Sequence, residues 1–456
     1  MPDPVALIDD RRQRLVDLVH VEVDDLDAAL AAVEEIQSVA QADRDLVIEG
    51  CALVHASWTH LLRGDFASAG FCLDRAEDVF AETAVDGLWE PPLLHACRGA
   101  LHAWRGEAGA PHFERAQRCA QEAGTPAGAA VSAALQADVD GGTDAPAEAP
   151  GGHGVEPMVG WAVVWARRGL AARALAAGDL SEAAELLDGL LAQHDGEERL
   201  NPVERGRTLV LQGEVQLRRG DAPAVPTLRE AATLLEGRGA RYPATRALLL
   251  LAEAEDDAAS AADALARARA LSSSDPAFRA LWELRPRLEV GVLGGQAVRL
   301  GEEPIALSKN AAQLVHLLAF AGPHGRHWER VADQLWPHVL DAQKAASNVT
   351  SLTRNTRARL GAEAWRLRRE GPMLFFDLDH GTLDLADAVA TADWCLGADP
   401  PRAPDRLAHA LVLLRRPVLP AWSDAPWVRE VDAWRAERLA AVTALLGGRA
   451  DWGRAG

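Results

Sequence analysis

Apolar residues recur at helical spacing from the N-terminus to position 283, and this pattern predicts one helix after another. Within "LLRGDFASAGFCLDRAEDVF" (61–80), Gly64 and Asp65 interrupt the pattern, which predicts a tight turn between two helices. Ala69 and Ala76 follow at positions where the second helix would pack closely on the first. Further glycine–acid pairs of this kind occur at Gly106-Glu107, Gly178-Asp179 and Gly220-Asp221.

The glycines that mark these turns are evenly spaced in each half of the segment. The interval from Gly64 to Gly106 is the same as the interval from Gly178 to Gly220. A recurring period of this size is typical of stacked helical hairpins. The segments resemble tetratricopeptide-type repeats, with a period longer than usual, which implies divergent repeats or long helices.

A stretch rich in Gly, Pro, Ala and Asp, residues 137–157, separates the two pairs of repeats. Such a composition buries little apolar surface, so it predicts a flexible linker. We therefore predict one helical repeat region at 1–136 and a second at 158–284.

From residue 286 the pattern changes to short β-prone runs separated by glycine turns. Residues 287–307 predict a small antiparallel sheet with a hairpin turn at Gly294-Gly295. Neither a Lys-Ser/Thr pair nor a G-x-G-x-x-G helix start follows these glycines, so a nucleotide loop is not predicted. Ser308 is then placed to cap a helix that Gly322 ends.

Two more helices and a second hairpin follow. Segment 327–337 predicts a short helix stopped by its final proline, and Asp341 is placed to cap a third helix over 342–360. Residues 364–378 predict two strands joined at Glu370-Gly371-Pro372. The predicted fold class is therefore mostly α, with helical repeats followed by a small α/β domain and a C-terminal helical module.

The charge distribution separates the third helix and the second hairpin from the rest of the chain. The formal net charge is −20, yet residues 342–369 contain seven basic residues and a single acid, Glu363. A surface that binds a polyanion needs local cations, not a basic total. The third helix contains no acid, which suits contact with phosphates; a solvated helix face without a partner is the alternative interpretation.

The order of these elements resembles the winged helix-turn-helix of OmpR-type regulators, and more closely that of activators of the antibiotic regulatory protein (SARP) type. The resemblance is carried by "LEVGVLGGQAVRLG", "VADQLWP", "NVTSLTRNTRARLG" and "LRREGPMLFFDLD". It implies a winged helix-turn-helix domain at 286–380. The segment "LDLADAVATADWC" and residues 410–446 resemble the bacterial transcriptional activator domain, which implies a helical module at 382–447.

This resemblance implies a DNA-binding transcriptional regulator that reads promoter DNA with its winged helix and contacts RNA polymerase. The repeats would bind a protein or small-ligand partner in their groove, and the C-terminal module would orient the winged helix or make it a homodimer. The candidates for contact with double-stranded DNA come from the third helix, the second hairpin and the start of the first helix. They are Lys309, Lys344, Ser347, Thr350, Ser351, Arg354, Asn355, Arg357, Arg366, Arg368 and Arg369.

The third helix departs from the family pattern at Thr353 and Thr356, where apolar residues are expected in addition to Val349 and Leu360. Leu352 can take over part of this packing if the helix is rotated slightly. Two hypotheses therefore stay open. One is a DNA-binding regulator, and the other is a repeat scaffold whose winged helix no longer binds DNA.

Other chemistry has little support in the sequence. It contains no Walker A loop, no metal-binding spacing and no nucleophile–base arrangement, so we predict neither an enzyme nor a bound cofactor. The five cysteines include no CxxC pair, and no apolar run has the length of a signal peptide or membrane span. These observations predict a cytoplasmic protein without a membrane segment.

Overall fold

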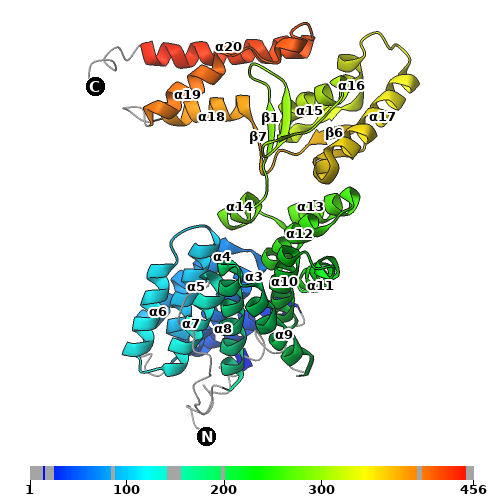
Figure 1. The fold of residues 1–456 in the computed structure, drawn as a ribbon. Helices are drawn as coiled ribbons and strands as arrows, with labels where there is room; N and C mark the ends of the chain where they lie inside the picture. Colours follow the sequence, from blue (N-terminus) through cyan, green and yellow to red (C-terminus); the bar gives the residue numbers. More distant parts are fainter. Residues whose placement is uncertain are drawn as a thin grey trace. The chain divides into compact units, whose positions relative to one another are not determined.

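The computed structural model divides the chain into two compact units, Met1–Trp282 and Glu283–Gly456. Helices dominate both units, and the strands that the structure describes belong to the second unit (Figure 1). The described residues are 14–15, 25–83, 88–140, 156–196, 201–397 and 403–447.

Most helices of the first unit pack against the helices that precede and follow them in the chain. This arrangement agrees with the helical hairpins expected from the spacing of the glycine turns. The helices are α2 (Leu26–Asp43), α3 (Leu46–Arg63), α4 (Phe66–Ala81), α5 (Glu90–Trp104), α6 (Ala110–Glu122), α7 (Pro126–Asp140), α8 (Glu156–Ala177), α9 (Leu180–Gly196), α10 (Pro202–Arg219), α11 (Ala224–Glu236), α12 (Arg241–Ala254), α13 (Ala258–Leu271) and α14 (Pro276–Glu283).

The predicted glycine turns lie between successive helices. Gly64 ends α3 with a φ of 74°, a left-handed conformation that glycine adopts without a steric penalty. Asp65 follows as the N-cap of α4, and its side chain accepts the backbone N–H of Ser68 at 3.2 Å. The other three turn glycines also have positive φ; they are Gly106, Gly178 and Gly220.

The predicted linker, 137–157, is wrong at both ends. Helix α7 continues to Asp140 and α8 begins at Glu156, so residues 137–140 and 156–157 are helical. The two helices are in direct contact. Residues 141–155 themselves lie outside the described part of the chain. The composition of the stretch did not reveal that its first acid, Asp138, has buried partners.

A buried network of ion pairs holds α7 against its neighbours. Arg168 of α8 contacts Asp138 of α7 (Nε–Oδ1, 2.5 Å) and Glu204 of α10 (Nη2–Oε2, 2.7 Å). Arg207 pairs with the same two carboxylates and lies over the ring of Trp58. Burial alone would raise the pKa of both carboxyls, but the two guanidinium groups hold the pKa of each below its usual value.

The two ends of the helical stack also meet. Helices α3 and α12 are in contact, and Arg241 Nε donates to the carbonyl oxygen of Arg63 at 2.7 Å. The backbone N–H of Leu26, at the start of α2, donates to the carbonyl oxygen of Arg238 at 3.2 Å. Contacts between residues far apart in the sequence therefore join the first helices to the last.

The second unit combines short strands with helices (Figure 1). Its elements are β1 (Leu288–Gly291), β2 (Ala297–Leu300), β3 (Glu303–Pro304), α15 (Lys309–Ala321), β4 (Arg326–His327), α16 (Trp328–Leu335), α17 (Ala342–Leu360), β5 (Leu367–Glu370), β6 (Met373–Phe376), β7 (Gly381–Leu383), α18 (Asp384–Leu396), α19 (Pro404–Leu414) and α20 (Pro426–Gly447).

Two small sheets organise this unit, in the strand orders β3-β2-β1-β7 and β4-β6-β5. The antiparallel pairs β1–β2 and β5–β6 confirm the two predicted hairpins. Strands β4 and β7 were not predicted. Strand β4 is very short, and β7 pairs in parallel with β1, which lies far earlier in the chain. Neither leaves a local sequence pattern.

The C-terminal helices share a hydrophobic core with the rest of the second unit. The ring of Trp427 in α20 lies 6.2 Å from the ring of Phe320 in α15. Leu419 donates its backbone N–H to the carbonyl oxygen of Val292, in the loop after β1, at 2.8 Å. Helices α18–α20 therefore form part of the core against which α15–α17 pack.

Candidate nucleic-acid interface

Helix α17 has the bounds that the sequence predicts. The Asp341 side chain caps it by accepting the backbone N–H of Lys344 at 2.7 Å, and Gly361, with a φ of 59°, ends it. Its buried side chains recur at helical spacing and face the core; they are Ala345, Val349, Leu352, Thr356 and Leu360. The remaining side of the helix therefore faces solvent.

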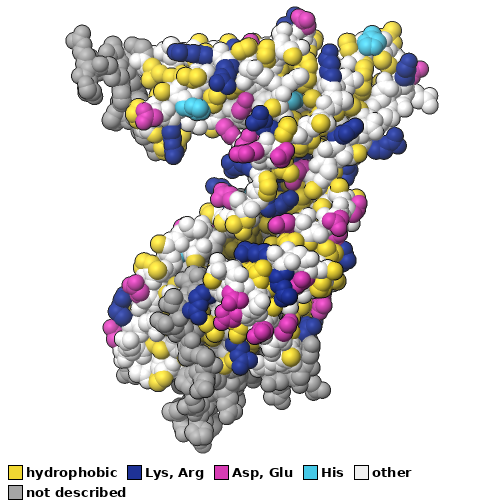
Figure 2. Space-filling model, in the orientation of Figure 1, with side chains coloured by type: hydrophobic (Ala, Val, Ile, Leu, Met, Phe, Trp, Pro, Cys, Tyr) yellow, Lys and Arg dark blue, Asp and Glu magenta, His cyan; other side chains and the backbone are white. Residues whose placement is uncertain are grey.

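The solvent side of α17 carries the basic residues. Arg354 and Arg357 are exposed, and neither has a hydrogen bond or an ion pair with any described residue. Figure 2 shows Lys and Arg side chains in the region where Figure 1 draws α17. The other exposed candidates are Lys309, Lys344, Ser347, Thr350, Ser351, Asn355, Arg368 and Arg369.

The packing of α17 accounts for its two unusual threonines. Leu352 is buried and takes a core position, as expected for a slightly rotated helix. Thr353 is half-buried and donates its hydroxyl to the carbonyl oxygen of Val349 at 2.8 Å. Thr356 is buried, and its hydroxyl has no hydrogen-bond partner among the described residues. The helix is thus held by a core contact that includes one unsatisfied polar atom.

Arg369 brings the β5–β6 hairpin next to α17. Its Nη1 donates to the Thr350 hydroxyl of α17 at 3.3 Å, and its Nε donates to the carbonyl oxygen of Gly371. Arg368, one position earlier, pairs with Glu370 and lies 5.4 Å over the ring of Phe375. Both arginines are exposed, but Glu370 offsets part of the charge of Arg368.

Arg366 was predicted as a candidate for contact with DNA, but the structure buries its side chain. Its side chain is 3% exposed and forms an ion pair with Glu363 (Nε–Oε2, 2.6 Å). Its Nη1 also donates to the carbonyl oxygens of Asp377 and Asp379, at 3.1 and 2.7 Å. Arg366 therefore fixes the chain on both sides of the hairpin and has no surface to offer DNA.

The buried carboxylate of Glu363 has a second cation beside it. Arg285 Nη2 lies 3.6 Å from Glu363 Oε1, so the only acid of the basic segment 342–369 is surrounded by guanidinium groups. Its negative charge is compensated inside the unit. The exposed part of the segment is therefore more uniformly cationic than the sequence count indicates.

Arg359 was absent from the predicted contacts but lies next to them. It lines a hollow together with Asn355 of α17 and with Ser308 at the start of α15. Arg359 is two positions after Arg357, which places it about 200° further round the helix. Its spacing of four positions from Asn355 was the signal that could have identified it.

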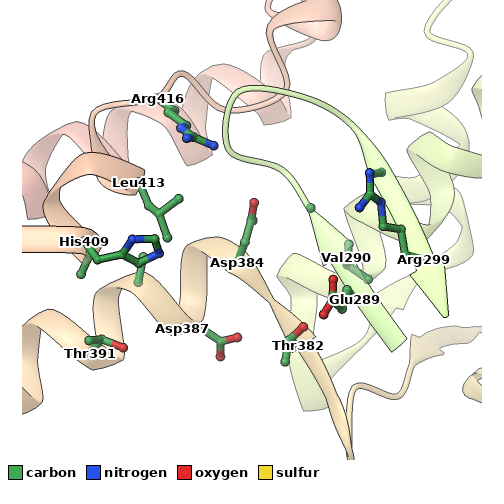
Figure 3. Close-up of a pocket in the computed structure, with 14 residues that line it drawn as sticks. Glu289, Val290, Arg299, Thr382, Asp384, Asp387, Thr391, His409, Leu413 and Arg416 are labelled. Carbon is green, nitrogen blue, oxygen red and sulfur yellow. The ribbon is translucent and has the colours of Figure 1, made fainter. Parts of the chain in front are cut away.

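A second hollow of the unit, about 670 Å³ in volume, lies between the β1–β2 hairpin and helices α18 and α19 (Figure 3). Asp384 lines it and accepts the backbone N–H groups of Val292 and Leu293, at 2.9 and 3.0 Å. Asp387 also lines the hollow, and burial raises the pKa of its carboxyl group. Arg416, just after α19, contributes a positive charge to the lining. Because charges of both signs line it, this hollow does not extend the cationic surface of α17.

No protein-family model and no curated protein matches this chain. Among the described residues, no group of three or more His, Cys, Asp or Glu side chains is arranged to hold a metal ion. A membrane-spanning helix is likewise absent from the described part of the chain, where every helix is too short or too polar.

Proposed function

We propose that this protein is a DNA-binding transcriptional regulator, in which α15–α17 and the β5–β6 hairpin act as a winged helix-turn-helix. One observation carries the proposal: α17 presents Arg354 and Arg357 to solvent without a partner among the described residues. An α-helix fits the major groove of DNA, where arginine pairs with guanine and asparagine with adenine. Asn355 lies between the two arginines and is also exposed.

The hairpin supports the same function. Arg368 and Arg369 lie at its exposed edge, and the bond from Arg369 to Thr350 places that edge beside α17. A helix in the major groove would then have two cations close to the adjacent phosphates. The acidic surface elsewhere would repel DNA in other orientations.

Selection of bound duplexes from a random-sequence pool, with the full-length chain, tests the proposal. A gel-shift titration with the selected duplex should show an affinity that falls steeply as salt rises, because phosphate contacts release counterions. No enriched duplex and no retarded band at low salt would overturn the proposal.

The double variant Arg354→Ala/Arg357→Ala should lower affinity for the selected duplex by at least roughly 100-fold. The matched control is Arg406→Ala/Arg429→Ala, which removes two exposed arginines from α19 and α20. This control should leave affinity unchanged within about twofold. Equal losses in the two double variants would show that α17 is not the reading helix.

A repeat scaffold that no longer binds DNA is the second candidate. The unsatisfied Thr356 hydroxyl favours it, because a weakly packed α17 would position its arginines poorly. In that case, the folded wild-type protein would show no salt-dependent binding to any duplex, and the arginine substitutions would change nothing.

A further inference from the structure

Helix α14 depends on contacts with distant parts of the first unit. It is too short to form a stable helix in isolation. The segment "SSSDP" (272–276) separates it from α13. Its anchors are aromatic and acidic side chains that reach helices from the beginning of the chain.

Phe278 is the central anchor of α14. It is fully buried, and its ring lies 5.8 Å from that of Phe66 in α4 and 5.7 Å from that of Tyr242 in α12. Trp104 of α5 completes the pocket by stacking on Tyr242 at 4.7 Å. Gly64 leaves space for the ring, because a Cβ atom there would overlap Phe278. Three helices of the repeat stack thus form an aromatic pocket around one side chain of α14.

A bidentate ion pair holds the start of α14 beside this pocket. Arg105 donates from Nε and Nη2 to the two carboxylate oxygens of Asp275, at 3.2 and 2.8 Å. The same carboxylate caps α14 by accepting the backbone N–H of Ala277 at 3.0 Å. The Arg105 side chain is 24% exposed, so this ion pair lies at the surface of the first unit and is partly open to solvent. Its guanidinium lies 6.0 Å over the ring of Phe66, which makes the cation and the aromatic pocket one continuous site.

We propose that Arg105 and the pocket of Phe66, Trp104 and Tyr242 form an acceptor site for a protein segment with a carboxylate three positions before an aromatic residue. Helix α14 occupies this site as an internal ligand, with Asp275 and Phe278 in the two roles. A partner protein that presents an acidic–aromatic helix displaces it. The side chains expected in the partner segment are inferred from α14, because α14 shows which groups the site accepts.

Displacement would change the connection between the two units. Only residues 283–287 lie between the first unit and β1. With α14 released, residues 272–284 would become part of the tether, while Arg285 keeps its ion pair with Glu363 of the second unit. A longer tether weakens the restriction on the second unit without any change inside that unit. Partner binding is thereby coupled to the freedom of the second unit, whether or not that unit binds DNA.

Hydrogen exchange in the full-length wild-type protein tests whether α14 opens on its own. Its last backbone amides should exchange at least roughly 100-fold faster than the central amides of α12. The variant Arg105→Gln, which leaves the ring contacts of Phe278 in place, should speed exchange in α14 by about tenfold and leave α12 unchanged. Equal protection of α14 and α12 in the wild type would overturn the proposal, because α14 would then be part of the core.

A synthetic peptide of residues 272–284, labelled with fluorescein, tests the acceptor site directly. The full-length Phe278→Ala variant has a vacated pocket and should bind the peptide at least roughly tenfold more tightly than the wild type. The control Phe71→Ala removes the same atoms from an exposed position on α4 and should bind like the wild type.

Peptides with Asp275→Asn or Phe278→Ala should each lose most of this affinity. A folded Phe278→Ala protein that binds the intact peptide no better than it binds these altered peptides would overturn the proposal. If Phe278→Ala does not fold, the exchange measurements on the wild type and on Arg105→Gln decide the matter. All of these measurements omit DNA, so their outcome is separate from that of the DNA-binding experiment.

Discussion

The buried arginines of the first unit and the arginines of α17 in the second unit have opposite surroundings. In the first unit, Arg168 and Arg207 are enclosed by Asp138 and Glu204, and their charge is neutralised by the chain itself. On α17 of the second unit, the cations face solvent and lack partners among the described residues. The residue type is the same, and only burial and the neighbouring carboxylates differ. A cation already paired inside a unit stabilises the fold, whereas an exposed cation without a partner is available to a phosphate.

The variant Asp138→Ala should show the largest effect of this contrast. It leaves two guanidinium groups buried with one carboxylate, and we expect a loss of about 3–5 kcal/mol in the free energy of unfolding. Chemical denaturation followed by circular dichroism measures it. The control is Asp74→Ala, which removes the exposed partner of Arg98 and should cost less than about 1 kcal/mol. Similar losses in the two variants would remove the distinction between buried and exposed pairs.

A buried histidine, His95 of α5, should make the stability of the first unit depend on pH. Burial, reinforced by Arg115, Arg98 and His112, lowers the pKa of His95 to about 4. Because this folded-state pKa lies below the unfolded value of 6.5, the stabilisation is complete above pH 6.5 and is lost as the pH falls toward 4. The loss for the first unit should reach at most roughly 3 kcal/mol.

Thermal melts between pH 7.5 and 5 compare the wild type with His95→Gln. The variant has no imidazole at this position to protonate on unfolding, so its stability should depend less on pH than that of the wild type. Parallel pH profiles for the two proteins would contradict the assignment to His95.

Thr356→Val should stabilise the second unit by about 1 kcal/mol. The substitution replaces a buried hydroxyl that has no partner among the described residues with a methyl group of similar size. Thr353→Val is the comparison, because it removes a hydroxyl that does have an acceptor. Urea denaturation that shows destabilisation by Thr356→Val would mean that this hydroxyl is satisfied in solution.

The smallest effect on stability is expected from Arg354→Ala/Arg357→Ala. Both side chains are exposed on α17, and alanine is a better helix former than arginine, so the free energy of unfolding should change by less than about 0.5 kcal/mol. Calorimetry of the unbound protein checks this. A larger loss would mean that these arginines stabilise the fold, as the buried arginines of the first unit do. It would weaken their proposed role in DNA binding.

Local patterns were sufficient to predict much of the candidate interface. Asp341 as an N-cap and Gly361 as a stop define α17, because capping and glycine conformation depend on residues within one turn. The buried positions of α17 follow from helical periodicity, including the core role of Leu352. The sequence could therefore indicate that a cationic helix face exists and which residues it carries.

Only the tertiary structure decided which of the predicted cations are exposed. Arg366 is buried because the fold brings Glu363 and the carbonyl oxygens of Asp377 and Asp379 around it. Asp138 belongs to a helix because Arg168 and Arg207 reach it from α8 and α10. By itself, the sequence determined caps, turns and helix faces, which depend on neighbours a few positions away. The pairing of charges and the packing of α14 against Arg105 depend on residues up to 170 positions apart, which only the folded chain brings together.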